Sequence, residues 1–158
     1  MTHRVLLALA LACLVLAGCT SGPVRRVSEP AASIQQLTVA ADGSWSVELR
    51  LQNYSSVPMR FDSLTLDVRI GDQAAGKLLH QPALTVGPES ADVVSVTMRP
   101  DAGARMVLAD ALASRRGVDY ALEGSIDAAP ADRGSSRSYR ILRKSALSPM
   151  PGLPGVLR

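Results

Sequence analysis

Carboxylates are the side chains of this sequence that offer the widest choice of chemistry. Two carboxylates held in one pocket can act as a general acid and a general base. The acidic residues of the chain body, however, lie far apart, at turns or on the polar sides of alternating stretches: Asp62, Asp67, Glu89, Asp92, Asp110, Asp119, Glu123 and Asp127. Their spacing brings no two of them into a pair, so it favours solvated acidic surfaces.

Other signatures of catalysis are absent from the sequence. There is no Gly-rich phosphate loop, no Gly-x-Ser-x-Gly segment, no helix with paired histidines and no calcium-binding loop. One Trp, three Tyr and one Phe do not form a stacking platform for bases or sugars, and Trp45 is expected in the core. We therefore expect no enzymatic activity and no cofactor.

The N-terminus has the pattern of a secretory signal. Residues 3–4 are basic and residues 5–16 form an apolar run, which is too short to cross a bilayer as a helix. The ending Leu16-Ala17-Gly18-Cys19 resembles the lipobox of bacterial lipoproteins. That resemblance implies diacylglycerol on the Cys19 sulfur, cleavage just before this residue and acylation of the new amine. An ordinary secretory signal, or a buried helix with an incidental cysteine, is the alternative interpretation.

Lipidation would determine the location of the protein. Residues 1–18 would be the signal peptide, and two or three acyl chains on Cys19 would anchor the mature chain stably to a membrane. Thr20 follows Cys19, whereas an Asp at that position retains enterobacterial lipoproteins at the inner membrane. We therefore expect an envelope protein anchored in the outer membrane and facing the periplasm, with envelope proteins or lipids as further partners.

Few residues remain for thiol, metal or histidine chemistry in the mature chain. Cys13 leaves with the signal and Cys19 is acylated, so neither a disulfide nor a Cys/His zinc site can form. His80 would be the one remaining histidine, and a Ser-His-Asp triad would have to use it. It lies at a predicted strand end before Pro82, where a solvated or capping imidazole is the ordinary interpretation.

The composition indicates one folded domain and excludes one class of partner. The chain has 158 residues, of which 47% are hydrophobic and 20% charged. Its net charge of +3 is too small for the dense basic stripe that phosphate binding needs, so we expect no nucleic-acid partner.

Segments without periodicity flank this domain on both sides. Residues 19–32 are predicted to form a tether, in which Arg25-Arg26 is either a solvated pair or a contact for anionic head groups. Residues 146–158 carry three prolines between Ser148 and Gly155 and are predicted to leave the domain as an extended or disordered segment. The folded domain is therefore predicted over residues 33–145.

Most of the domain alternates with a period of two residues, which is typical of half-buried antiparallel strands. The clearest stretches are residues 45–52, 64–70, 94–98 and 118–126, and weaker ones are residues 34–39, 77–84 and 138–142. Phe61 is out of phase with Leu64, which predicts a bulge near Asp62-Ser63. About seven strands separated by Gly-containing turns predict an all-β, immunoglobulin or fibronectin type III-like antiparallel sandwich.

One stretch follows a helical period instead. Apolar residues recur at helical spacing between residues 104 and 112, after Asp101, which is a suitable N-cap. Arg115-Arg116 is expected to supply a basic last turn, and Gly117 the C′ position. This predicts one short amphipathic helix over about residues 102–115.

The order of these elements resembles the late embryogenesis abundant type 2 family, also called the water stress and hypersensitive response domain. The resemblance covers residues 33–145. Its most specific parts are the Asn-x-Ser-x-x-Pro turn at residues 53–58 and the Leu-x-x-x-x-Gly-x-x-Tyr-x-Leu-x-Gly segment at residues 112–124. The resemblance implies a fibronectin-like sandwich with one helix, and many bacterial members are small lipoproteins. Tyr54 stands where the family often has proline.

The turn of this motif has a local physical explanation. Asn53 can bond to its own backbone and tolerate a left-handed conformation, while Pro58 opens the next strand where no amide donor is needed. Both residues are interpreted as structural and not as a ligand site.

Two functions remain open from the sequence. The first is a non-catalytic, membrane-anchored domain that protects envelope components under desiccation through weak protein or membrane contacts, as the resemblance implies. The second is a dedicated envelope adaptor or lipid-binding module with one specific partner. For the adaptor, an exposed strand edge or the groove beside the helix is the expected binding surface.

Overall fold

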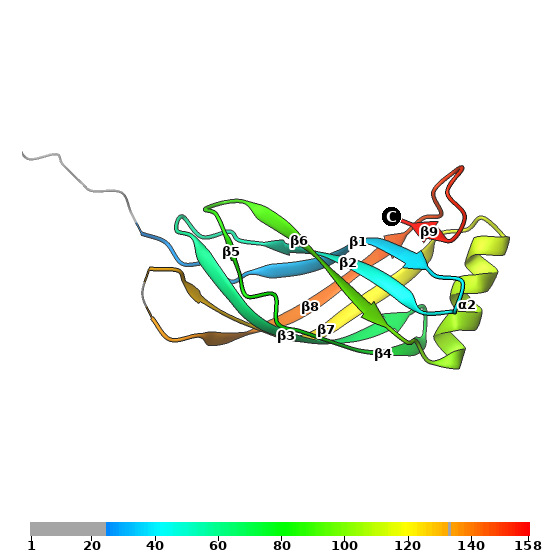
Figure 1. Ribbon diagram of the computed structural model, residues 1–158, viewed down its shortest axis with the longest axis horizontal. Helices are drawn as coiled ribbons and strands as arrows, with labels where there is room; N and C mark the ends of the chain where they lie inside the picture. Colours follow the sequence, from blue (N-terminus) through cyan, green and yellow to red (C-terminus); the bar gives the residue numbers. More distant parts are fainter. Residues whose placement is uncertain (1–24, 133) are drawn as a thin grey trace, which may run out of the picture.

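The computed structural model describes residues 25–132 and 134–158, which fold into two antiparallel sheets packed face to face with one helix at one end (Figure 1). The four-stranded sheet has the order β6-β2-β1-β9. The five-stranded sheet has the order β4-β3-β7-β8, with β5 paired to β3. This is the all-β sandwich with one short helix that the sequence predicts, with nine strands among the described residues where about seven were expected.

The elements have the following bounds: β1 Ala31–Val39, β2 Trp45–Gln52, β3 Met59–Ile70, β4 Gln73–His80, β5 Leu84–Val86, β6 Ala91–Met98, α2 Ala102–Ala113, β7 Val118–Pro130, β8 Arg137–Leu147 and β9 Val156–Leu157. The weak stretch predicted over residues 77–84 is thus divided between β4 and β5, because residues 81–83 leave the sheet.

The core lies between the two sheets and follows the predicted alternation. Trp45, Val47, Leu49 and Leu51 of β2 are at most 1% exposed. The apolar residues of β3 from Leu64 to Ile70 are at most 2% exposed. The polar residues between them point outward, so the phase of both strands is confirmed.

The predicted bulge in β3 is also confirmed. The register between β3 and β7 shifts between Phe61 and Ser63. One extra residue restores the phase, so that Phe61, fully buried, and Leu64 both point into the core.

Helix α2 covers the end of the sandwich and packs against β4 and β3. Ala104, Leu108 and Ala111 form its buried face. Asp101 occupies the predicted N-cap position, but its side chain makes no capping hydrogen bond. The prediction for the C-terminus, with a basic last turn and Gly117 at C′, is wrong.

The helix ends two residues earlier, with Arg115 at C′. Arg115 adopts the left-handed region with φ of 53°, which glycine usually occupies. Its N–H donates to Leu112 O at 3.2 Å, and the N–H of Arg116 donates to Ala111 O at 2.9 Å. These two bonds are the Schellman pattern, which satisfies the last helical carbonyls without a glycine.

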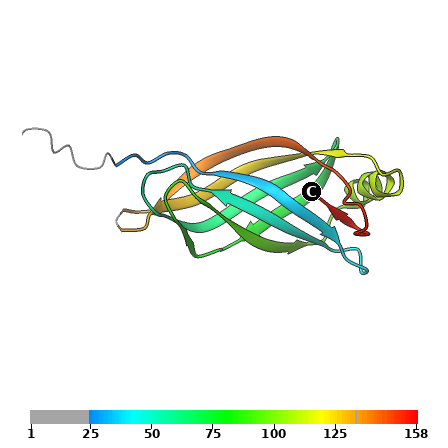
Figure 2. The same ribbon diagram turned by 90° about the horizontal axis from the view of Figure 1, so that it is seen from above.

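The prediction that residues 146–158 leave the domain is wrong. Leu147 is the last residue of β8, and the chain then returns so that Val156 and Leu157 pair with Thr38 and Leu37 of β1. Leu157 is fully buried. The prolines break the alternation but do not prevent the segment from covering part of the β1 edge beside α2 (Figure 2).

Candidate functional site

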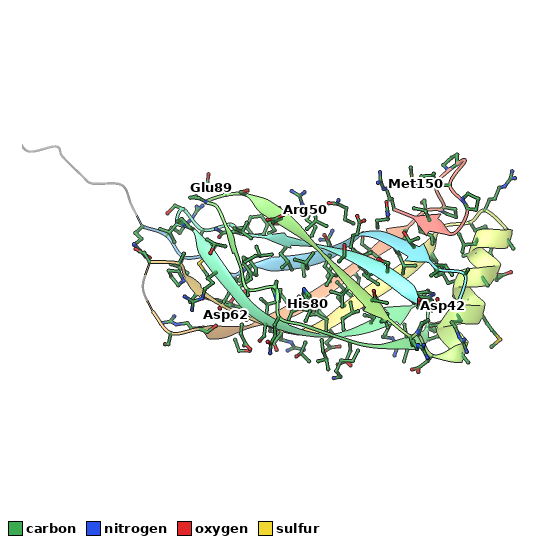
Figure 3. All side chains as sticks on the ribbon, viewed as in Figure 1. Asp42, Arg50, Asp62, His80, Glu89 and Met150 are labelled. Carbon is green, nitrogen blue, oxygen red and sulfur yellow. The ribbon has the colours of Figure 1, made fainter. Side chains whose placement is uncertain are left out.

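The side chains with possible chemistry are dispersed over the sandwich. His80 is half-buried at the end of β4, opposite Leu64 of β3. Asp42 lies near the α2 end and Glu89 near the other end, while Asp62 and His80 lie between them (Figure 3). Within residues 25–132 and 134–158, no three His, Cys, Asp or Glu side chains gather as metal ligands would.

Most of the predicted surface carboxylates contact a basic side chain: Asp62 with Arg60 at 2.6 Å, Asp67 with Lys77 at 3.0 Å, Glu89 with Arg26 at 3.1 Å, Asp110 with Arg116 at 2.5 Å and Glu123 with Arg140 at 3.2 Å. These pairs are on the surface, where solvent screening leaves an ion pair little net effect on stability. Asp127 accepts from Ser63 Oγ at 2.6 Å, and Asp92 accepts from the N–H of Val93 at 2.8 Å. The carboxylates thus act as surface ion-pair and hydrogen-bond partners.

The pKa shifts have the same local causes. Hydrogen bonds from Arg60 hold the pKa of Asp62 below its usual range. Hydrogen bonds from the Ser44 side chain and backbone do the same for Asp42, in the turn between β1 and β2. Both groups lie in turns or on strand surfaces, so the shifts reflect local structure and not a catalytic pocket.

The residues of the lipidation motif, Leu16, Ala17, Gly18 and Cys19, lie outside the described residues. The described part of the predicted tether, residues 25–30, does not hang free but lies against the sandwich. We call this stretch the N-terminal strap. Arg25 forms a bidentate ion pair with Asp132, in which Nη1 lies 2.7 Å from Oδ2. Pro30 is buried just before β1 begins.

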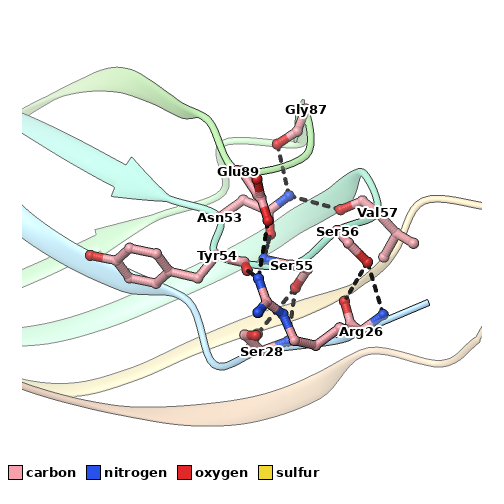
Figure 4. Close-up of polar contacts among 9 residues, drawn as sticks. All are labelled: Arg26, Ser28, Asn53, Tyr54, Ser55, Ser56, Val57, Gly87 and Glu89. Carbon is pink, nitrogen blue, oxygen red and sulfur yellow. Dashed lines mark hydrogen bonds and ion pairs between the residues drawn. The ribbon is translucent and has the colours of Figure 1, made fainter. Parts of the chain in front are cut away.

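The N-terminal strap also pairs with the loop between β2 and β3 (Figure 4). The N–H of Arg26 donates to Ser56 Oγ at 2.8 Å, and the N–H of Ser56 donates to Arg26 O at 3.0 Å. The N–H of Ser28 donates to Ser55 Oγ at 2.9 Å. Arg25 and Arg26 are thus paired with Asp132 and Glu89 of the domain while both side chains stay partly exposed, and a contact with anionic head groups is still a prediction.

Asn53 organises this loop from inside. Its side chain is 1% exposed, and its Oδ1 accepts from the N–H of Ser55 at 2.8 Å. Its Nδ2 lies 2.9 Å from Val57 O, 3.2 Å from Val86 O and 2.8 Å from Gly87 O. Asn53 therefore joins the β2–β3 loop to the end of β5 (Figure 4). Its φ is not positive, so the left-handed conformation considered for it does not occur.

Pro58 is exposed and comes just before β3, which begins at Met59. Its carbonyl accepts from the N–H of Ala131 at 2.9 Å. The missing N–H of Pro58 thus falls outside the β3 ladder, where no donor is required.

Two hollows and several single apolar side chains mark the surface. A groove of about 880 Å³ lies beside the end of α2. Its lining includes Leu112 and Arg115 from the end of the helix and the loop from Pro149 to Gly155. A wider hollow of about 1410 Å³ covers the outer face of the five-stranded sheet and includes Asp67, Arg69, Leu142 and Lys144. The exposed large apolar residues are spread over different elements: Val27, Tyr54, Leu79, Met106, Leu142 and Leu153.

The second family motif, residues 112–124, runs from α2 into β7. Tyr120 and Leu122 are buried, and the Tyr120 hydroxyl accepts from the N–H of Ile34 at 3.1 Å, joining β7 to β1 across the core. Gly124 lies so close to β3 that an added Cβ would be 2.1 Å from Thr65 O. The motif therefore specifies contacts between the sheets and between strands.

Sequence reasoning missed the docking of the strap and the bond between Tyr120 and Ile34. Both join residues far apart in the chain through single polar groups, such as Arg26 with Ser56. Such contacts leave no periodic pattern. The Asn-x-Ser turn was the one signal for this region, and it marks the loop without indicating its partner.

The comparison with protein families identifies the domain. Residues 48–137 match the family model of the late embryogenesis abundant protein, LEA_2. This match covers more than half of the chain, which therefore belongs to the late embryogenesis abundant type 2 family and carries its stress-related domain. No curated protein sequence matches the chain.

Solved structures with a similar fold come from distant proteins. A protein from Archaeoglobus fulgidus is 13% identical with a TM-score of 0.44, and the match covers 78% of this chain and 98% of that one. A protein from Arabidopsis thaliana is 11% identical with a TM-score of 0.46, covering 80% and 81%. A protein described as late embryogenesis abundant is 12% identical with a TM-score of 0.49, covering 98% and 86%. The family assignment depends on the sequence match and not on these similarities.

Among the described residues, no helix has the length and apolar character that a membrane span requires.

Proposed function

We propose that this protein is a lipid-anchored, non-catalytic envelope protein whose stress-related domain protects other envelope components by weak contacts. The observation that carries the proposal is the family match over residues 48–137. The Leu16-to-Cys19 motif supports the anchor. The dispersed apolar side chains support many weak contacts in place of one large apolar patch.

The N-terminal strap gives the anchored domain an orientation. It holds the start of the described chain at the end of the sandwich opposite α2 (Figure 1). Cys19 and Arg25 are six positions apart, which allows a reach of at most about 20 Å. An anchor on Cys19 would therefore keep the strap end close to the membrane, while α2 and the groove beside it face away.

The anchor is tested by Cys19→Ser. We expect the variant to move from the membrane fraction to the soluble periplasm, because acylation of Cys19 supplies the membrane affinity in this proposal. The domain should remain folded, since none of the described core residues lies near that position in the sequence. Fractionation followed by immunoblotting measures the distribution, with Thr20→Ser as the matched control. A Cys19→Ser protein that stays on membranes in high salt would contradict the anchor.

The protective activity is tested with the purified full chain. We expect it to reduce the aggregation of an unrelated enzyme during drying or heating, measured by light scattering and recovered enzyme activity. Replacing His80 by Ala should leave this protection unchanged, because the half-buried imidazole joins no described cluster. Protection no better than an equal mass of albumin would contradict the proposal.

The groove beside α2 favours a second function, that of an adaptor with one specific partner. Crosslinking in intact cells followed by purification distinguishes the two functions. Many substoichiometric proteins are expected for general protection. A single stoichiometric partner, whose loss has the same phenotype as loss of this protein, would establish the adaptor instead.

A further inference from the structure

The outer edge of β8 is a long strand edge without a partner in the described part of the chain. All eleven residues from Arg137 to Leu147 pair with β7, and β8 ends the strand order of its sheet. Figure 2 shows β8 (orange) along the outer border of the molecule. Such an edge presents unpaired N–H and C=O groups, which another extended chain can bond.

This edge is much more basic than the other edge strands. It contains four cations and no acid, whereas the edge strands β4 and β6 contain a single lysine and a single aspartate respectively: Arg137, Arg140, Arg143 and Lys144 in β8, Lys77 in β4, and Asp92 in β6. The concentration is local, because the whole chain has a net charge of only +3.

Most of these cations have no acidic partner among the residues that the structure describes. Arg140 pairs with Glu123 at 3.2 Å, and both of these side chains are more than half exposed. Arg137, Arg143 and Lys144 are exposed and form no ion pair with the described residues. Three positive charges along one strand edge are therefore available to a bound molecule.

The cations lie on both faces of the strand. Arg143 has the same parity as the buried Ile141 and Leu147, so it stands at a core-side position, whereas Arg140 and Lys144 have the outward parity. A charge at a core-side position of an edge strand opposes pairing with an apolar strand. It also opposes pairing with β8 of a second copy, where like charges would face each other.

We propose that the β8 edge binds an extended acidic segment of another protein, which adds to the five-stranded sheet as a further strand. The backbone of the added strand would satisfy the free groups of β8, and its acidic side chains would pair with Arg137, Arg143 and Lys144. Nucleic acid and anionic lipid offer phosphate to the cations, but they cannot form a strand ladder with the backbone. This binding requires neither the anchor on Cys19 nor the protective activity.

The probe is an acetylated and amidated ten-residue peptide of alternating Thr and Glu, added to the purified full chain. We expect its fluorescence anisotropy to report binding at least tenfold tighter than that of the matching Thr and Lys peptide. Binding should weaken steadily with added salt. Hydrogen exchange should slow at amides of β8, because a new ladder protects them, and not at amides of β4 or β6.

Charge reversal locates the site. Arg143→Glu on the core-side face and Lys144→Glu on the outer face should each weaken peptide binding about tenfold. Arg50→Glu, at an exposed position of the interior strand β2, makes the same change of charge away from β8 and should not alter binding. Circular dichroism identifies any variant that unfolds. If one of the two β8 variants unfolds, the other still tests the site.

Three results would overturn the proposal. The first is equal binding of the acidic and basic peptides. The second is binding of the acidic peptide without added protection of β8 amides, which would indicate a nonspecific ionic contact. The third is stronger binding to anionic phospholipid vesicles that is lost in Arg143→Glu, which would assign the edge to a membrane.

Discussion

Replacing Gly124 by alanine is expected to destabilise the sandwich by about 3 to 5 kcal/mol. Gly124 lies in β7 opposite Leu66 of β3 and has φ of 155°. An added Cβ would lie 2.1 Å from Thr65 O, 3.0 Å from Thr65 C and 3.1 Å from Leu66 Cα. These are backbone atoms of a central strand, so relief requires β3 and β7, the two interior strands of the five-stranded sheet, to separate.

Urea denaturation followed by circular dichroism measures the loss in the free energy of unfolding, and in thermal denaturation we expect a fall in Tm of about 10 °C. Gly87→Ala is the matched control. Gly87 does not have a left-handed φ, and the nearest atom to an added Cβ is Ser90 Cβ at 3.9 Å. Its replacement should change the free energy of unfolding by less than about 1 kcal/mol. Equal stability of Gly124→Ala and Gly87→Ala would mean that β3 and β7 are not this close.

Gly124 illustrates what the sequence could and could not predict. The second family motif, residues 112–124, ends on this residue, but the reason for the glycine is a close contact with Thr65, and no local pattern contains that contact. By contrast, the inward positions of Trp45, Leu49 and Leu66 were predictable because strand alternation is a local property. Fold class and strand phase therefore follow from periodicity, while close approaches between strands do not.

The two ends of the domain were predicted incorrectly for the same physical reason. Prolines suppress periodicity around residues 148–155, yet the following Leu157 is fully buried and pairs with Leu37. A strand of two residues is too short to show an alternation. The strap is held by Arg26 and Ser56, thirty residues apart, through single hydrogen bonds. Composition indicated loops in both places, and only the tertiary structure shows where those loops lie.

The candidate functional residues divide in a similar way. The Cys19 motif is a sequence signal and lies outside the described residues, so its role is still a prediction. The basic edge of β8 was visible only as a weak strand in the sequence. Its free edge and unpaired arginines become apparent once β7 is known to be its partner.

Asn53→Ala is the second change with a large expected effect, a loss of about 3 to 5 kcal/mol in the free energy of unfolding. The substitution removes the acceptor for the Ser55 N–H and the donor shared by three carbonyls, those of Val57, Val86 and Gly87. Asn53 is 1% exposed, so water cannot easily replace these bonds. A buried polar group left without a partner costs about 1 to 3 kcal/mol.

Gln52→Ala is the matched control for this change. Gln52 is the neighbouring residue, and its amide donates to Ser90 O at 3.0 Å in an exposed position. Its replacement should cost less than about 1 kcal/mol, because water can take over that bond. If both variants lose the same stability in urea denaturation, the Asn53 network has no special energetic role.

Asn53→Asp separates the donor from the acceptor. The carboxylate keeps an oxygen for the Ser55 N–H but turns a second oxygen toward the carbonyls of Val57 and Gly87, where only repulsion results. Protonation removes the buried charge and supplies one donor, so this variant should gain stability relative to the parent as the pH falls toward about 4.

Because Ser55 and Ser56 also hold Ser28 and Arg26, amide exchange in the N-terminal strap should accelerate in Asn53→Ala and Asn53→Asp but not in Gln52→Ala. Unchanged amide exchange of the strap in all three variants would show that the loop keeps its shape without Asn53. The docking of the strap would then not depend on the hydrogen bonds of Asn53.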